Sequence, residues 1–183
     1  MPARSEEPRR RAGRAPRTLG SVTEKRSAGI LLFRGADPAG TDPASGAQVL
    51  LGHMGGPFWA RKDERAWSVP KGEYEPDEDP VDAARREFEE ELGLPPPPGD
   101  LLPLDSVRQT GGKVVTVWAL AGDLDPSRVT PGTFEMEWPK GSGRLRLFPE
   151  IDRVAWLDLP EARRKIVAKQ AVFLDRLEER LRG

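Results

Sequence analysis

Apolar residues gather in short runs near the start of the chain and at helical spacing further on. The continuous apolar run at residues 30–33, within 27–34, predicts a buried strand. A second apolar run at residues 49–51 predicts another strand, and the Gly-, Asp- and Pro-rich stretch 35–46 between them predicts a loop. The two strands are therefore expected to form a hairpin.

The clearest helical pattern lies between Asp79 and Gly93. Asp79 is a typical N-cap, Pro80 suits the first helical position, and Gly93 suits the left-handed residue that ends a helix. An apolar stripe recurs at steps of three and four residues, which predicts one face packed on a sheet with the glutamates outside it. The members of this stripe are Val81, Ala84, Phe88 and Leu92.

The rest of the pattern predicts further strands and one closing helix. The expected strands lie at residues 67–70, 102–108, 113–121 and 154–157, and the closing helix covers 160–181. Alternation at residues 134–138, with apolar side chains on one face and glutamates on the other, is typical of an edge strand. Strands before, between and after helices predict an α/β fold with a mixed sheet covered on both faces.

Composition is consistent with one globular domain. The chain has 183 residues, 37% of them hydrophobic, which is enough for a single buried core. Cysteine is absent, which excludes disulfides, thiolate metal sites and cysteine nucleophiles. No apolar run reaches eighteen residues and no signal segment is recognisable, so we expect a cytoplasmic protein without a membrane partner.

Charge is unevenly distributed along the chain. The net charge is −1, but residues 1–26 hold eight Lys or Arg against three Glu. This segment is poor in large apolar residues and is predicted to be a disordered basic tail preceding a domain at 27–183. Electrostatic contact of the tail with RNA or a membrane surface is one interpretation, and a solvated extension is the other.

Three acidic residues on the predicted helix indicate metal chemistry. Glu87, Glu90 and Glu91 are spaced i, i+3 and i+4, so their side chains leave one face of the helix. Carboxylates this close repel one another unless a cation lies among them, and Mg²⁺ prefers such oxygen ligands together with substrate phosphates. A solvated, salt-bridged helix face would show the same run of glutamates.

The surrounding residues resemble the Nudix box, the sequence signature of the Nudix hydrolase family. The nine matching positions are Gly72, Glu78, Arg86, Glu87, Phe88, Glu90, Glu91, Gly93 and Leu94. The resemblance is greatest to small uncharacterised bacterial Nudix proteins. It implies an α/β/α sandwich that hydrolyses a phosphoanhydride bond in a nucleoside diphosphate-linked substrate, such as an NTP, a dNTP or a dinucleoside polyphosphate. The alternative is a Nudix-fold module that binds nucleotide or RNA without turnover.

The same resemblance implies roles for the box residues. Glu87, Glu90 and Glu91 with the backbone at Gly72 would bind Mg²⁺ or Mn²⁺, and Glu87 either binds metal or orients the attacking water. Glu87, Glu90 and Arg86 would form the catalytic group, in which Arg86 holds the carboxylates by ion pairing. Arg86 could equally do no more than brace the loop.

Residues outside the box are candidates for binding substrate. His53, the only histidine, is a candidate acid or base, although a lone histidine is also often structural. Trp59 could stack on a base, and Lys71 could contact a phosphate or simply face solvent. We expect a small-molecule nucleotide partner and a monomer or homodimer.

Members of the family often supply one further carboxylate from outside the box. Glu135, Glu137 and Glu150 are the candidates, and each could also be an ordinary surface glutamate. A proline that accompanies ADP-ribose hydrolysis in the family is absent beyond the box, where Arg108 and Gln109 stand instead. ADP-ribose is therefore a less expected substrate.

Overall fold

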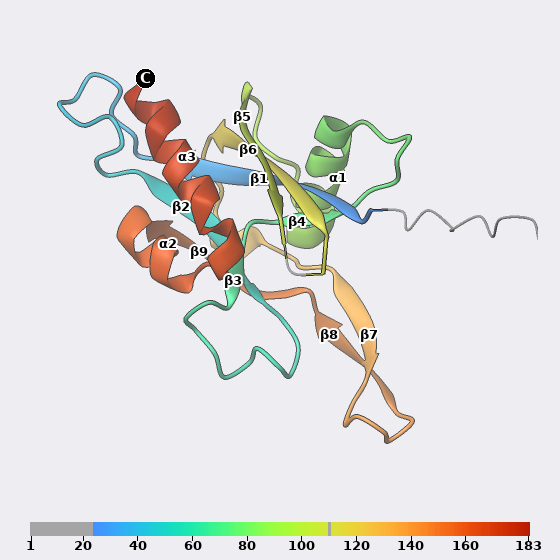
Figure 1. Cartoon of the computed structure of the whole chain (residues 1–183). Coiled ribbons are helices and arrows are strands. Elements are labelled where there is room, and N and C mark those ends of the chain that lie inside the picture. Colours follow the sequence, from blue (N-terminus) through green and yellow to red (C-terminus); the bar gives the residue numbers. More distant parts are fainter. Residues whose placement is uncertain (1–23, 110) are drawn as a thin grey trace, which may run out of the picture.

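The computed structural model describes residues 24–109 and 111–183. Figure 1 shows the order of its elements along the chain. The strands are β1 (Arg26–Arg34), β2 (Gln48–Met54), β3 (Trp67–Ser68), β4 (Lys71–Glu73), β5 (Leu101–Arg108), β6 (Val114–Ala121), β7 (Thr133–Glu137), β8 (Leu145–Pro149) and β9 (Ile151–Asp158). The α-helices are α1 (Pro80–Leu92), α2 (Leu159–Lys165) and α3 (Ala171–Arg182). Residues 1–23 of the predicted basic tail lie outside the described residues.

Seven strands form one sheet, and its mixed character was predicted from the sequence. The order is β3-β2-β1-β6-β5, with β4 also pairing with β1 and β9 with β2. β1 and β6 run parallel, whereas the other pairs of this sheet are antiparallel. The predicted hairpin of the first two strands is confirmed by the pairing of Phe33 with Val49.

Helices cover both faces of this sheet (Figure 1), α1 on one face and α2 with α3 on the other. Ile30 and Leu32 of β1 belong to the core beneath α1, whereas Leu31 and Phe33 belong to the core beneath α2 and α3. The continuous apolar run of β1 is explained by this burial on both faces. The α/β/α arrangement expected from the sequence is confirmed.

Helix α1 begins and ends at the predicted residues. The Asp79 carboxylate accepts hydrogen bonds from the backbone N–H groups of Val81 at 2.8 Å and Asp82 at 3.2 Å. Gly93 has a φ of 68°, in the left-handed region that glycine adopts without strain. Glu87 is buried, contrary to the expectation that the glutamates lie outside the packed face.

The single closing helix predicted at residues 160–181 is wrong, because α2 and α3 are separated by an extended segment and a 3₁₀ turn at Ala168–Gln170. Ile166 has φ −66° and ψ 144°, which is not helical, and it forms a β-bridge with Trp67. The Val167 N–H then donates to the Trp67 carbonyl oxygen at 2.8 Å. Tertiary pairing thus overrides the helical spacing of the apolar residues.

A separate two-stranded sheet, β7 with β8, projects from the body of the molecule (Figure 1). Its first strand confirms the edge strand expected near residues 134–138, whereas β8 was not predicted. The hairpin returns directly into β9 through the single residue Glu150. Among the helices of the described residues, none has the length and apolar character needed to cross a membrane.

Candidate active site

Strand β4 places the box glycine directly against helix α1. A Cβ atom added to Gly72 would lie 1.6 Å from Oε2 of Glu87, a distance that no side chain could tolerate. The Glu87 carboxylate therefore rests on the backbone at Gly72, and only glycine permits this contact. The pairing of Gly72 with Ala28 of β1 fixes that backbone within the main sheet.

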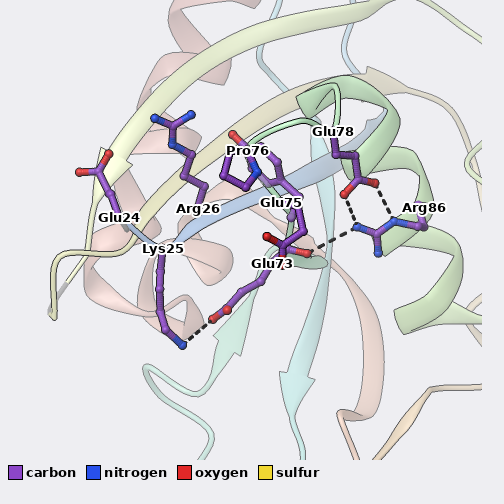
Figure 2. A pocket seen from close by; sticks show the side chains of 9 residues that line it. Glu24, Lys25, Arg26, Glu73, Glu75, Pro76, Glu78 and Arg86 are labelled. Carbon is purple, nitrogen blue, oxygen red and sulfur yellow. Dashed lines mark hydrogen bonds and ion pairs between the residues drawn. The ribbon is translucent and has the colours of Figure 1, made fainter. Parts of the chain in front are cut away.

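Arg86 links the box loop to the carboxylates of the helix. Its Nε and Nη2 atoms donate to the two oxygens of Glu78 at 2.8 Å and 2.9 Å, as Figure 2 shows. Its Nη1 atom donates to Glu87 at 2.6 Å and to Glu90 at 3.1 Å. The predicted ion pair with Glu90 is formed, and Glu78 closes the loop onto the helix.

Glu91 is held by a different donor from Glu87 and Glu90. The backbone N–H of Lys71 donates to its Oε2 atom at 2.9 Å. Burial raises the pKa of Glu91 to about 7, although the nearby Lys71 charge opposes this rise. Burial also raises the pKa of Glu87 and lowers that of Lys71. The charge of Glu150 adds to the rise for both glutamates, so it lies within their electrostatic reach.

Of the three candidates for a further carboxylate, Glu150 is the one that the structure brings to the box. A Cβ atom on Gly132 would lie 3.1 Å from both Glu150 Oε2 and the carbonyl oxygen of Glu90. Glu137 instead accepts a hydrogen bond from the Gly143 N–H at the far turn of the hairpin, at 2.5 Å. Glu135 is exposed on β7.

The carboxylates of the box are held by donors of the protein. Glu87 and Glu90 accept from Arg86, and Glu91 accepts from the Lys71 backbone. Within residues 24–109 and 111–183, no three acidic or histidine side chains stand close enough together to hold a metal ion in these positions. A cation here would have to draw oxygens away from these donors. The all-oxygen donor set nonetheless fits a hard divalent ion such as Mg²⁺ or Mn²⁺.

A cavity of about 380 Å³ opens beside Lys71. Its lining combines cations, amides and apolar side chains: Met54, Trp59, Arg65, Ser68, Lys71, Gln109, Val167, Ala168, Lys169 and Gln170. Two predicted substrate residues, Lys71 and Trp59, are therefore brought together in one cavity. The Trp59 ring also lies 4.6 Å from the Lys62 ammonium group.

Two glutamines of this cavity were not anticipated from the sequence. The Gln109 Nε2 atom is buried without a hydrogen-bond partner among the described residues. Gln170 is buried, and its Oε1 accepts a hydrogen bond from the Val69 N–H at 2.9 Å. This bond joins the 3₁₀ turn between α2 and α3 to the segment between β3 and β4. A lone glutamine at the end of a strand or in a helical run carries no pattern of its own, so sequence analysis could not single them out.

His53, the third residue predicted to act on substrate, does not line this cavity. The side chain is fully buried, with Nε2 lying 2.7 Å from the Lys62 carbonyl oxygen and Nδ1 lying 2.6 Å from an Asp152 carboxylate oxygen. Its ring also meets that of Trp67 edge-on, with centroids 5.3 Å apart. Both ring nitrogens have protein partners, which is typical of a histidine with a structural role.

A second cavity, of about 420 Å³, lies on the outer side of the box loop (Figure 2). It is lined by Glu24, Lys25, Arg26, Glu73, Tyr74, Glu75, Pro76, Glu78 and Arg86. Several of these charges already neutralise one another, since Lys25 Nζ lies 3.5 Å from Glu73 and Arg86 is committed to Glu78. The lining has no surplus of positive charge to attract a phosphate.

Comparison with known proteins agrees with this geometry. The NUDIX domain profile matches residues 23–177, so the chain belongs to the Nudix family. The RNA pyrophosphohydrolase of Pseudomonas putida is 44% identical over 59 residues, which are 32% of this chain and 36% of that protein. The RNA pyrophosphohydrolase of Xanthomonas campestris pv. campestris is 45% identical over 67 residues, 36% of this chain and 32% of that protein. The chain thus matches only about a third of the length of these relatives.

Solved structures share the fold at low sequence identity. A C. elegans Ap4A hydrolase has a TM-score of 0.55 and 21% identity, covering 85% of this chain and 97% of that one. A mutT/nudix family protein from Listeria innocua has a TM-score of 0.53 and 18% identity, covering 86% and 94%. These similarities confirm the architecture of the chain.

Proposed function

We propose that the chain is a divalent-metal-dependent hydrolase of a phosphoanhydride bond in a nucleoside diphosphate-linked substrate. The observation that carries the proposal is the position of Lys71. Its backbone N–H binds Glu91, while its side chain lines the cavity that also holds Trp59 and Gln109. A phosphate bound by the Lys71 ammonium group would therefore lie between the box carboxylates and the cavity.

The box supplies the groups that such chemistry requires. Glu87, Glu90 and Glu91, with the Gly72 backbone and Glu150, would hold Mg²⁺ or Mn²⁺, which would neutralise the phosphates and activate the attacking water. Arg86 positions Glu87 and Glu90 through its hydrogen bonds. Trp59 offers a ring on which a base can stack.

The substrate class is supported by the lining of the Lys71 cavity and by the relatives. Lys71, Arg65 and Lys169 supply positive charge, which favours a nucleoside triphosphate or a dinucleoside polyphosphate. The Pseudomonas and Xanthomonas relatives are RNA pyrophosphohydrolases, which adds a phosphorylated RNA end to the substrates to be tested.

The test is a panel of nucleotides and 5′-triphosphorylated RNA incubated with Mg²⁺ or Mn²⁺, with products separated by chromatography. We expect Glu90→Gln and Glu91→Gln to lower turnover at least about a hundredfold. Glu89→Gln is the matched control, because Glu89 is an exposed residue of the same helix. Equal turnover of all three variants would contradict the site. Nucleotide binding by calorimetry without hydrolysis of any substrate would instead favour a binding module.

A further inference from the structure

The β7–β8 hairpin has two faces of different chemistry. Phe134 lies opposite Phe148 and Met136 opposite Arg146, and the Trp138 N–H extends this ladder to the Arg144 carbonyl oxygen at 2.9 Å. Opposite residues of an antiparallel pair project to the same side. We call this side the aromatic face, which consists of Phe134, Met136, Trp138, Arg144, Arg146 and Phe148. The other side, the acidic face, carries Glu135, Glu137, Leu145 and Leu147.

The loop after β2 extends the aromatic face. Phe58 is 57% exposed, and its ring meets that of Trp138 edge-on with centroids 5.4 Å apart. The Phe134 ring lies close to Gly56 in the same loop. Arg144 and Arg146 are exposed beside these rings. The surface therefore alternates aromatic rings with arginines and carries no carboxylate from either strand.

The aromatic face begins at the proposed catalytic carboxylates. The Glu150 N–H donates to the Gly132 carbonyl oxygen at 2.9 Å, which closes the base of the hairpin, and the Glu150 carbonyl oxygen accepts from the Gly55 N–H at 2.8 Å, which ties this base to the loop after β2. Gly132 lies against the carbonyl oxygen of Glu90 in the box helix. From this base the hairpin extends away from the sheet (Figure 1). Trp59, next to Phe58, lines the Lys71 cavity. A chain held by its terminal phosphates at the box could continue along this face.

We propose that the aromatic face of the hairpin, together with Phe58, binds a single-stranded nucleic acid whose phosphorylated end is held at the box. Every base has a flat face that can stack on Trp138 or Phe58, and the two arginines complement the phosphates between bases. A single nucleotide seated in the Lys71 cavity would not need this surface. The position of the phosphorylated end rests on the proposed function, whereas binding of the strand does not.

Binding can be measured with an oligonucleotide that has no anhydride bond. We suggest fluorescence anisotropy with a 5′-hydroxyl single strand of about ten nucleotides, as RNA and as DNA. Loss of one base-stacking ring costs about 1–3 kcal/mol, so Trp138→Ala should weaken binding roughly 5- to 150-fold. Arg146→Ala should also weaken binding, and it should reduce the slope of log K against the logarithm of the salt concentration by about one unit. Leu147→Ser on the acidic face should leave the affinity unchanged.

Activity gives a second readout. We compare kcat/KM for a triphosphorylated oligonucleotide with kcat/KM for a nucleoside triphosphate. The ratio of the two should fall in Trp138→Ala and in Arg146→Ala, but not in Leu147→Ser. Since Arg146 is exposed, its replacement should not disturb folding, which thermal unfolding can verify.

Two results would overturn this proposal. One is oligonucleotide binding that stays unchanged in Trp138→Ala and Arg146→Ala, or that Leu147→Ser weakens as much as these two variants do. The other is a change of oligomeric state: sedimentation shows a dimer for the wild type and a monomer for Leu147→Ser, while no variant alters binding of the nucleic acid. The hairpin would then be a contact between two copies of the chain. An inactive protein that still binds the oligonucleotide through Trp138 would refute the proposed hydrolysis and leave the strand surface standing.

Discussion

Arg86 and Glu78 are joined by two parallel hydrogen bonds, Nε to Oε1 at 2.8 Å and Nη2 to Oε2 at 2.9 Å. The pair is partly exposed, so it adds little to the stability of the fold. The same guanidinium holds Glu87 and Glu90, and through this connection the box loop determines where the carboxylates of α1 lie.

We predict that Arg86→Lys lowers kcat/KM roughly 10- to 100-fold, as expected when the support of the proposed metal ligands Glu87 and Glu90 is lost. A lysine keeps the charge but cannot form the planar fork to Glu78. The thermal midpoint should change little. Steady-state kinetics with Arg85→Lys as control would test this, and full activity of Arg86→Lys would show that the fork is dispensable.

His53 is predicted to matter for stability and not for the reaction. His53→Ala leaves the Lys62 carbonyl and the Asp152 carboxylate without their partner, and should cost about 2–4 kcal/mol of unfolding free energy. The folded fraction should retain kcat within about threefold, far from the 10²–10⁴-fold loss expected for a general acid or base. Urea unfolding and kcat measured well below the midpoint separate the two roles. A large fall in kcat at unchanged stability would restore a catalytic role.

The helix boundaries that were predicted correctly from the sequence are fixed by neighbours in the chain. Asp79 and Gly93 bound α1 through contacts a few residues away, and the box spacing places Glu87 and Arg86 on one helix. The break after α2 depends on Trp67, about a hundred residues earlier, and therefore left no local pattern. The apolar residues of segment 160–181 are spaced as in a helix, but the pairing of Ile166 with Trp67 interrupts the helix.

In the site, too, some contacts depend on spacing along the chain and others on the fold. The ion pair of Arg86 with Glu90 was predicted from their spacing, whereas the position of Glu150 beside the box is visible only in the fold, because Glu135, Glu137 and Glu150 look alike in sequence. The burial of His53 against Trp67 and Asp152 could likewise not be predicted from the sequence, because it depends on how β2 and β9 pair.

Gln109 is predicted to contact substrate in the Lys71 cavity. Gln109→Glu should raise the KM for a nucleotide about tenfold, because a carboxylate there would repel the phosphates. Gln109→Leu should also raise KM, yet should stabilise the fold by about 1 kcal/mol, since it removes a buried donor that has no partner among the described residues. Since Glu and Leu are both similar to Gln in volume, each variant serves as a control for side-chain size in the other. A KM unchanged in both would place the substrate outside this cavity.

Asp63 provides a test of stability against pH. The Trp67 indole N–H donates to its carboxylate at 3.0 Å and, with Lys165 at 3.3 Å, lowers the pKa of Asp63. Because the folded pKa lies below the unfolded value of about 3.9, the stabilisation is present above that pH and lost as pH falls through the folded pKa. Asp63→Asn should therefore be less stable than the wild type at pH 7.

At a pH below the folded pKa of Asp63, the two proteins should have the same stability. Urea unfolding at a series of pH values gives the comparison, with Glu64→Gln as the control at the adjacent exposed residue. A difference between wild type and Asp63→Asn that stays constant across the series would mean that the carboxylate charge contributes nothing.

The parallel pairing of β1 with β6 also has a consequence for synthesis of the chain. Arg26 pairs with Val114, so roughly ninety residues must leave the ribosome before the central strand finds this neighbour. The box helix emerges earlier, but its core includes Leu120, Leu124 and Ile151, which come later. A nascent chain that stalls before β6 therefore lacks part of the apolar core that packs on α1, and this core is complete only once Ile151 has been synthesised.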